Sequence, residues 1–134
     1  MAVFLLEVVT PDKTVLKKDV EMAICPGTEG EFGILPNHVS LLSALKIGPL
    51  VYREDGKDET LFIGGGFVDM NNNVCSVLAE SAERADDIDE ARAKAAKERA
   101  ELRLAQKEEN IDVLRAEAAL HRAIIRLQIK SKPM

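Results

Sequence analysis

The stretch Ala82-Glu-Arg-Ala-Asp-Asp-Ile-Asp-Glu-Ala-Arg-Ala93 separates two halves of the chain that differ in composition. Before it, glycine, proline and β-branched residues interrupt short apolar runs. After it there is no glycine, the only proline is Pro133, and alanine, glutamate, lysine, arginine and leucine predominate. This change predicts a β-structured half followed by a helical half. We therefore expect an α+β protein with a β domain at 1–84 and a helical domain at 85–134.

Composition limits the classes of protein that the chain can represent. Its 134 residues are 46% hydrophobic and 31% charged, which is typical of a soluble, foldable chain. A net charge of −5 argues against a broad surface for phosphate backbones, so we expect no nucleic-acid partner. The segment 1–7 has no basic start and its apolar run stops at Glu7, and no other segment approaches the ~20 apolar residues of a membrane span. We expect contact with a membrane only through partner proteins.

The first half predicts many short strands separated by turns. The apolar runs lie at 3–9, 15–20, 21–25, 39–45, 50–53, 60–63, 67–70 and 74–79. Glu54-Asp55-Gly56-Lys57 and Asn71-Asn72-Asn73 are typical of hairpin turns, because Asn and Gly tolerate positive φ angles. Short strands at near-regular spacing favour an antiparallel β-sandwich or barrel, and of the two we expect the sandwich.

Three features of this half invite a chemical interpretation, and each has a simpler one. Cys25 and Cys75 match no zinc spacing and are expected to be buried free thiols, so no metal site is expected. The run Gly64-Gly65-Gly66 lacks the Lys-Ser/Thr of a phosphate-binding loop and precedes a strand, which favours a bulge or a close backbone approach. His38 has no obvious nucleophile beside it, which favours a packed or hydrogen-bonded loop residue.

The second half predicts two helices joined by a short connection. Asp87 is the expected N-cap of the first helix, with Glu90 three residues later as its capping-box partner. We expect this helix to reach about residue 107 and the second to run from about 112 to 130. The connection is expected at 108–112, where Asn110 or Asp112 can cap the second helix. Such a short connection makes the two helices an antiparallel hairpin.

An apolar stripe is predicted on each helix. On the first helix it comprises Ile88, Ala91, Ala95, Leu102 and Ala105, and on the second Val113, Ala116, Leu120, Ala123, Ile124 and Leu127. At ~25 cal/mol per Å² of buried apolar surface, alanine stabilises a seam far less than leucine does. The hairpin is therefore predicted to be marginally stable and able to open.

Arginines gather on one flank of each predicted helix. They are Arg92, Arg99 and Arg103 on the first helix and Arg122 and Arg126 on the second. With a turn near 109–110, position 92 comes opposite 126–127 and position 99 opposite 120. The four arginines that can then converge are Arg92, Arg99, Arg122 and Arg126. A polyphosphate would convert their mutual repulsion into bidentate, charge-assisted hydrogen bonds. The simpler alternative is a solvated face whose arginines pair with Glu98, Glu101, Glu117 or water.

Two stretches of the first half resemble a known family. Glu29-Gly-Glu-Phe-Gly-Ile-Leu-Pro-Asn-His-Val-Ser-Leu-Leu-Ser-Ala-Leu-Lys-Ile-Gly48 is similar to the hallmark loop and strand of the epsilon subunit of F-type ATP synthases. Gly64-Gly-Gly-Phe-Val-Asp69, followed by Val74-Cys-Ser-Val-Leu-Ala79, resembles the next signature of that family. The likeness extends over essentially the whole chain. The family often has glycine at the position of Asn37 and Ala-Pro at Val39-Ser40, so partner contacts of this loop transfer less directly.

The resemblance implies a non-catalytic subunit of a bacterial, proton-translocating ATP synthase. In the family the sandwich binds the gamma subunit and sits on the c-ring. Glu31 matches the acidic position that faces the ring, and His38 lies on the neighbouring loop. Compact helices permit ATP hydrolysis, whereas extended helices insert among the alpha and beta catalytic subunits and block it. A peripheral position at the cytoplasmic face of the bacterial plasma membrane follows, with no required cofactor.

The second half resembles the epsilon subunits that bind ATP. Ile88-Asp-Glu-Ala-Arg-Ala93 fits the Ile/Leu-Asp-x-x-Arg-Ala motif of those subunits. The positions of Arg122 and Arg126 resemble the arginines of their second helix. The implied ATP-binding residues are Glu83, Asp89, Arg92, Ala93, Arg99, Arg122 and Arg126. ATP would then be a regulatory ligand and not a substrate, because no catalytic apparatus accompanies this set.

Two other functions stay open. A helical adaptor in the same complex would use the hairpin for protein contacts alone and leave the arginines without a ligand. A free-standing nucleotide-hydrolysing enzyme would have to use the glycines at 64–66. The missing Lys-Ser/Thr and the lack of clustered general bases argue against such an enzyme.

Overall fold

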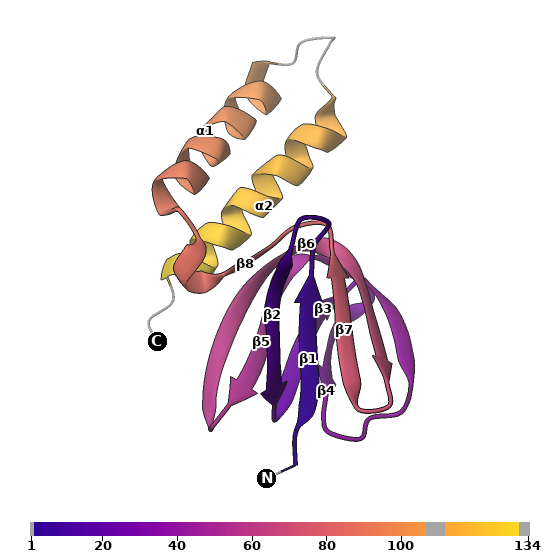
Figure 1. Ribbon diagram of the computed structural model, residues 1–134. Helices are drawn as coiled ribbons and strands as arrows, with labels where there is room; N and C mark the ends of the chain where they lie inside the picture. Colours follow the sequence, from indigo (N-terminus) through magenta and orange to yellow (C-terminus); the bar gives the residue numbers. More distant parts are fainter. Residues whose placement is uncertain (1, 107–111, 132–134) are drawn as a thin grey trace. The chain divides into compact units, whose positions relative to one another are not determined.

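The chain forms a β unit followed by a helical unit, as the sequence predicts (Figure 1). The structure, a computed structural model, describes residues 2–106 and 112–131. It divides into two compact units, Met1–Ala85 and Asp86–Met134. The division falls inside the stretch 82–93, where the composition of the chain changes.

The first unit is a β-sandwich whose strands follow one continuous pairing path. The strands are β1 (Phe4–Val9), β2 (Thr14–Val20), β3 (Met22–Gly27), β4 (Gly30–Ile34), β5 (Leu41–Glu54), β6 (Lys57–Asn71), β7 (Val74–Ala79) and β8 (Ala82–Arg84). Their order is β2-β1-β7-β6-β5-β3-β4, with β8 paired to β6. The predicted antiparallel sandwich is confirmed, although β1 and β7 pair in parallel. Turn signals do not reveal that pair, because its strands lie far apart in the sequence.

Some strand boundaries differ from the prediction. The runs at 39–45 and 50–53 belong to one 14-residue strand, β5, and those at 60–63 and 67–70 to one 15-residue strand, β6. Their glycines look like breaks in a local pattern, but β5 and β6 pair with each other on both sides of them. β4 covers residues 30–34, where the pattern predicts no strand. Long-range pairing therefore decided these elements.

The glycines at 64–66 mark the place where β6 changes its neighbour. Before them β6 pairs with β8, and from Gly66 onward it pairs with β7. The backbone N–H of Gly64 donates to the carbonyl of Ser81 at 2.8 Å. A Cβ at Gly66 would overlap the carbonyl oxygen of Leu78. The predicted close backbone approach is confirmed.

Two-residue turns close the β5–β6 and β6–β7 hairpins, as predicted. Asp55 and Gly56 have φ angles of 51° and 77°, and Asn72 and Asn73 have 51° and 62°. Positive φ at both central positions matches the right-handed twist of the paired strands.

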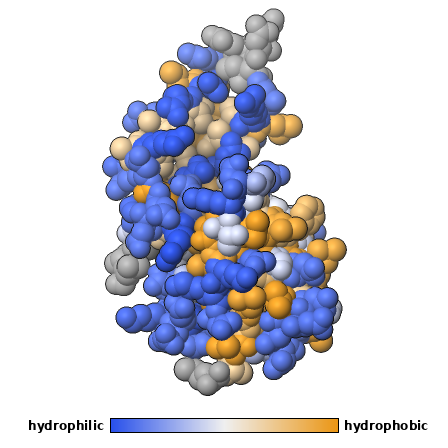
Figure 2. All heavy atoms as spheres, in the orientation of Figure 1, coloured by the Kyte–Doolittle hydropathy of each residue, from blue (hydrophilic) through white to orange (hydrophobic). Residues whose placement is uncertain are grey.

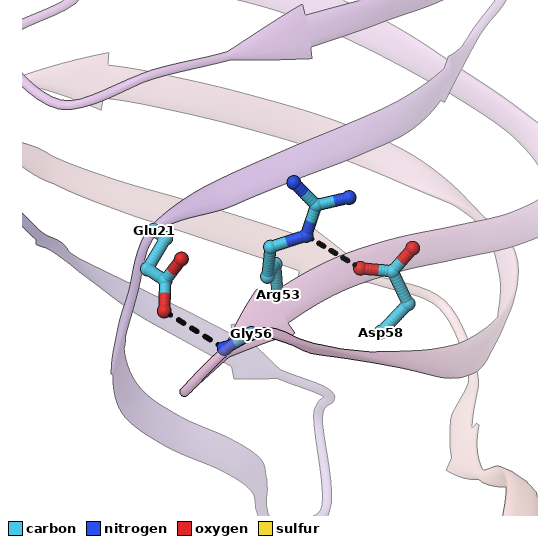
Figure 3. A network of polar contacts seen from close by, with 4 residues as sticks. All are labelled: Glu21, Arg53, Gly56 and Asp58. Atoms are coloured by element: carbon cyan, nitrogen blue, oxygen red, sulfur yellow. Dashed lines mark hydrogen bonds and ion pairs between the residues drawn. The ribbon is translucent and has the colours of Figure 1, made fainter.

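The β5–β6 turn is braced by two side-chain contacts (Figure 3). The backbone N–H of Gly56 donates to Glu21 Oε1 at 3.0 Å, and Arg53 Nε donates to Asp58 Oδ1 at 2.8 Å. The hydrogen bond that Arg53 donates to Asp58 raises the pKa of Arg53, so this arginine stays charged. Exposed pairs of this kind contribute little stability, and their main effect is to hold the turn in register.

The sandwich core contains both cysteines. Cys25 on β3 and Cys75 on β7 are fully buried free thiols, which confirms the prediction. Burial, together with the neighbouring Cys75, raises the pKa of Cys25 to about 12. Burial and the charge of Asp69 raise the pKa of Cys75 to about 12 as well.

These thiols predict a loss of stability in alkaline solution. In the folded state the pKa values of both thiols lie above the ordinary value of 9.0. Their contribution to the free energy of unfolding is therefore complete below about pH 9 and is lost as the pH rises toward 12. At pH 10 the loss amounts to about 1.4 kcal/mol per thiol, because the unfolded thiols ionise and the buried ones do not. Urea unfolding of the sandwich at pH 8 and pH 10 measures the difference. A variant with both Cys25→Ala and Cys75→Ala should have a flatter pH dependence, and an equal slope in both proteins would contradict the assignment.

Large apolar side chains also lie on the sandwich surface. Val39, Leu42, Phe67 and Leu78 are each more than half exposed. On the face drawn in Figure 2, hydrophobic residues gather over the sandwich among hydrophilic ones. Within the described residues, the helices are too short or too polar to cross a membrane.

The second unit is an antiparallel pair of helices that follows a short 3₁₀ turn (Figure 1). The turn is η1 (Ala85–Asp87), and the helices are α1 (Glu90–Gln106) and α2 (Val113–Ser131). The predicted cap Asp87 is wrong, because it lies in η1. Asp89 caps α1 instead: its Oδ1 accepts from the Arg92 N–H at 3.0 Å. Asp112 caps α2 in the same way, as predicted, and the rest of the predicted connection lies outside the described residues.

The seam between the helices is built from alanines that alternate between them. Ala93 and Ala100 of α1 are buried, as are Ala116 and Ala123 of α2, and each pair is spaced by seven residues. Gln106 and Val113 stand on either side of the connection. A residue of α1 therefore lies beside the residue of α2 that is the same number of positions away from the connection. Counted in this way, the four alanines follow one another along the seam at intervals of three or four residues.

Of the stripe predicted for the first helix, only Ile88 is buried, at 3% exposure, and it precedes α1, whereas the stripe of α2 is largely confirmed. On α1, Ala91, Ala95, Leu102 and Ala105 are exposed. They lie on the face opposite the seam, and alanines on both faces of α1 make the pattern ambiguous. On α2, Ala116 and Ala123 are buried, Leu120, Ile124 and Leu127 are half-buried, and only Val113 is exposed.

Candidate functional site

Arginines of α1 lie on one flank beside the buried alanines. Arg92 immediately precedes Ala93, and Arg99 immediately precedes Ala100, so each is turned by about 100° from the seam in the same sense. Arg103 follows Arg99 by four residues and shares this flank. All three arginines are exposed.

The same arrangement occurs on α2. Arg115 precedes Ala116, Arg122 precedes Ala123, and Arg126 follows four residues after Arg122. Arg115 is exposed, and the other two arginines are half-buried. Two antiparallel helices are exchanged by a 180° rotation about an axis perpendicular to the plane that contains them. This rotation leaves each flank on the same side of that plane. The arginine flanks of α1 and α2 therefore face the same side of the hairpin.

The six arginines form three levels along the hairpin, which we call the arginine ladder. Counted from the residues that flank the connection, the levels are Arg92 with Arg126, Arg99 with Arg122, and Arg103 with Arg115. The sequence predicted the convergence of the first two levels. It left out the third, although the repeated Arg-Ala pairs could have revealed it.

The glutamates that the structure describes within α1 and α2 lie away from the arginine ladder. The helical glutamates within the described residues are Glu90, Glu98, Glu101 and Glu117, and helical geometry places all four on the other flank. Among the described residues, Arg92, Arg99 and Arg103 take part in no ion pair, and Lys94 pairs with Glu90 at 3.5 Å. For Arg92, Arg99 and Arg103, the described residues therefore do not form the predicted alternative of pairing with these glutamates. Clustered guanidinium groups favour a multivalent anion.

The remaining predicted ATP residues lie around the start of α1. Asp89 is exposed and accepts a backbone hydrogen bond as the helix cap. Ala93 is 4% exposed and packs in the seam. Glu83 is half-buried in β8, where it pairs with Phe62, and belongs to the sandwich unit. The roles of all three residues in ATP binding stay predictions.

A second candidate site is the loop between β4 and β5. The side chain of Asn73 joins three segments here: its Oδ1 accepts from the Asn37 N–H at 2.8 Å, and its Nδ2 donates to the Val3 carbonyl at 2.9 Å. Ser40 Oγ donates to Asn71 Oδ1 at 3.3 Å. The loop is therefore held to the β6–β7 turn, and the turn is in its own right held to Val3, just before β1. Sequence reasoning missed this role of Asn73.

Of the two predicted partner-binding residues, Glu31 lies on β4 before this loop and His38 lies within it. Glu31 is exposed on β4 and pairs with Pro26. The ring of His38 donates from Nδ1 to the Val39 carbonyl at 2.7 Å, because a carbonyl can only accept. This confirms His38 as a hydrogen-bonded loop residue. Its contact with a partner stays a prediction.

An open apolar groove of about 330 Å³ lies on another part of the sandwich. It is lined by Val9, Thr10, Pro11, Gly66, Phe67, Leu78, Ala79 and Glu80. Phe67 and Leu78 are paired across β6 and β7 and are 56% and 58% exposed. Adjacent exposed apolar side chains of this size are typical of surfaces that contact another protein.

Comparison with known proteins identifies the family. Residues 3–85 match the family described as ATP synthase, Delta/Epsilon chain, beta-sandwich domain. Residues 86–131 match the ATP synthase, Delta/Epsilon chain, long alpha-helix domain. The chain belongs to the ATP synthase delta/epsilon family. The predicted epsilon-type subunit is thus confirmed.

Curated members of the delta/epsilon family resemble this chain over most of their length. An ATP synthase epsilon chain of Nitratidesulfovibrio vulgaris strain DP4 is 57% identical over 101 residues, which is 75% of each chain. That of Pelotomaculum thermopropionicum is 51% identical over 102 residues, or 76% of each chain. A cryo-EM structure of the Euglena gracilis mitochondrial ATP synthase (OSCP, F1 and c-ring) contains a chain with 26% identity and a TM-score of 0.77. The match covers 90% of this chain and 77% of that one.

The departure from the family at Asn37 has a structural explanation. Asn37 has a φ angle of 63°, in the left-handed region where glycine is the usual residue and asparagine the next most tolerated. An epsilon-type loop can therefore keep its shape with asparagine at this position, while the side chain adds a polar group that glycine lacks.

Proposed function

We propose that this chain is the central-stalk epsilon subunit of a bacterial proton-translocating F-type ATP synthase. In this proposal the sandwich couples the gamma subunit to the c-ring, and the helical hairpin inhibits ATP hydrolysis when it extends toward the alpha and beta subunits. When its hairpin is compact, the chain binds ATP without hydrolysing it, and the residues assigned to ATP are Glu83, Asp89, Arg92, Ala93, Arg99, Arg122 and Arg126. The observation that carries the sensor role is the arginine ladder beside an alanine seam.

The alanine seam makes the hairpin a suitable switch. Alanine side chains bury little apolar area, and several larger side chains of both helices are exposed, including Leu102 and Leu114. At ~25 cal/mol per Å², such a seam holds the helices weakly. A ligand that binds only the compact form stabilises it by about 2.7 kcal/mol at a hundredfold excess over its Kd. Against a weak seam this is enough to shift the population of compact hairpins.

The surface of the sandwich supports the coupling role. The apolar groove beside Phe67 and Leu78 suits a protein partner, and we assign it to the gamma subunit. The loop held by Asn73 presents His38, and with Glu31 it is assigned to the c-ring. In this proposal the subunit is peripheral and reaches the cytoplasmic face of the plasma membrane only through these partners. No cofactor is needed, and nucleic acid is not a partner.

A non-catalytic role is supported by the place of the glycines at 64–66. They lie inside a sheet, where β6 changes neighbours, and not before a helix N-terminus that could cradle phosphates. A free-standing hydrolase therefore lacks its expected loop. A ligand-free helical adaptor is the second candidate, and ATP titration separates it from the sensor.

Arg92→Ala and Arg126→Ala are each expected to weaken ATP binding at least tenfold, or about 1.4 kcal/mol, because each removes a charge-assisted contact with the phosphates. Isothermal titration of the full chain with ATP measures the affinity. Phosphate release measured in the same samples is expected to be absent.

Lys94→Ala is the matched control, because Lys94 is an exposed cation of α1 on the flank away from the ladder. Its ATP affinity should stay within about twofold of that of the unaltered chain. Unchanged affinity in both arginine variants would remove the sensor role and leave the adaptor.

A further inference from the structure

The two helical segments are internal repeats of each other. Residues 88–104 and 111–127 align with an offset of 23 and are identical at 10 of 17 positions. The shared pattern is Ile-Asp-x-x-Arg-Ala-x-Ala-Ala-x-x-Arg-Ala-x-x-Arg-Leu. The motif that was related to ATP binding in the first helix is therefore present twice, the second time as Ile111-Asp-Val-Leu-Arg-Ala116.

The repeats have the same local structure. Asp89 and Asp112 both accept at Oδ1 from the N–H three residues later, at 3.0 Å in each case. Their carbonyls accept from Ala93 and Ala116, again at 3.0 Å. Both alanines are buried in the seam. Each helix thus begins with the same cap and buries the same face.

Two like helices in antiparallel contact are related by an approximate two-fold axis perpendicular to the pair. The offset of 23 makes Arg99 equivalent to Arg122, so the middle level of the ladder lies on this axis. The same two-fold axis exchanges the level of Arg92 and Arg126 with the level of Arg103 and Arg115. The two halves of the ladder are therefore equivalent in composition and spacing.

The length of the ladder exceeds what a triphosphate can span. From Arg92 to Arg103 the rise along α1 is about 16 Å, at 1.5 Å per residue. A triphosphate reaches one outer level and the middle level, and it leaves the other outer level free. A longer phosphoanhydride chain reaches all three levels, and such a chain has a two-fold symmetry of its own.

We propose that the arginine ladder binds linear polyphosphate chains longer than a triphosphate, centred on Arg99 and Arg122. The chemical class includes inorganic polyphosphate and dinucleoside polyphosphates, which share the phosphoanhydride chain. Guanidinium groups bind each phosphate in a bidentate manner, and three levels provide more such contacts than two. This inference deepens the proposed function, because ATP and a longer chain compete for the middle level.

Titration of the full chain with inorganic tripolyphosphate, medium-length linear polyphosphate, diadenosine pentaphosphate and ATP tests the proposal. The longer inorganic chain should bind at least tenfold more tightly than tripolyphosphate. In the variant with Arg103→Ala and Arg115→Ala this advantage should disappear, while the affinity for ATP stays within about twofold. If the longer inorganic chain outbinds tripolyphosphate and diadenosine pentaphosphate binds more tightly still, the dinucleoside source is identified.

The matched control carries Lys94→Ala and Lys97→Ala, which remove two positive charges from α1 outside the ladder. This variant should keep the preference for the longer chain. Equal loss in both double variants would show a non-specific charge effect and overturn the proposal, as would equal affinities for tripolyphosphate and the longer chain. If the longer chain binds through the ladder but ATP does not, the ATP sensor fails and the polyphosphate site stands. If ATP alone binds, the polyphosphate site fails and the ATP sensor stands.

Discussion

Replacing Gly66 by alanine is expected to destabilise the sandwich by about 4 kcal/mol, as the sum of a strained backbone angle and an overpacked contact. Gly66 has a φ angle of 143°, and a Cβ there would meet the carbonyl oxygen of Leu78 and lie 2.8 Å from the Cα of Ala79. Both neighbours belong to the backbone of β7, so neither can move without breaking strand pairing. Urea unfolding followed by circular dichroism of the full chain measures the loss.

Gly30→Ala separates the two causes of this effect. Gly30 has a similar φ angle of 125°, but a Cβ there has no atom within 4 Å. This variant should therefore lose only the strain, about 1–3 kcal/mol. Equal losses in Gly30→Ala and Gly66→Ala would show that the close approach of β6 to β7 contributes nothing.

Replacing Ala123 by leucine is expected to open the hairpin while the sandwich stays folded. Ala123 is 1% exposed and lies between levels occupied by Ala93 and Ala100, so a larger side chain must push the helices apart. Overpacking costs about 1–3 kcal/mol, which is a large share of the stability of an alanine seam. Amide hydrogen exchange should show at least tenfold weaker protection of α1 and α2, with β-strand protection unchanged.

Ala95→Leu is the matched control, because it makes the same substitution at an exposed position of α1. Protection of the helices should stay as in the unaltered chain, since leucine and alanine are both strong helix formers. This pair of variants also separates the two assignments of the seam. If Ala95→Leu opened the hairpin as Ala123→Leu does, the face of α1 predicted from the sequence would be the correct one.

Local signals predicted the parts of the fold that depend on neighbouring residues. Asp55-Gly56 and Asn72-Asn73 form the predicted turns, because positive φ is an intrinsic preference of Gly and Asn. Asp112 caps α2 for a similarly local reason. The cap of α1 was misplaced by two residues, since Asp87 and Asp89 both suit a cap and only the path of the chain out of β8 distinguishes them.

The arginine levels followed from local periodicity once the buried face of each helix was known. Arg92, Arg99, Arg122 and Arg126 were predicted to converge because spacings of four and seven repeat on a helix flank. Arg103 was predicted on the same flank as Arg92 and Arg99 but was not paired with a residue of the second helix, and Arg115 was left out. The offset of 23 between the helices was visible in the sequence and would have supplied Arg115.

By itself the sequence determined the two units, the turn residues, the α2 stripe and the family, because each depends on local pattern or on direct resemblance. Only the tertiary structure decided which alanines of α1 form the seam, since alanine on both faces gives no hydrophobic direction until a second helix covers one of them. It also decided that β5 and β6 continue through their glycines, and that Asn73 ties the β4–β5 loop to the β6–β7 turn and that turn to Val3. These features depend on partners distant in the sequence, where local preferences carry no information.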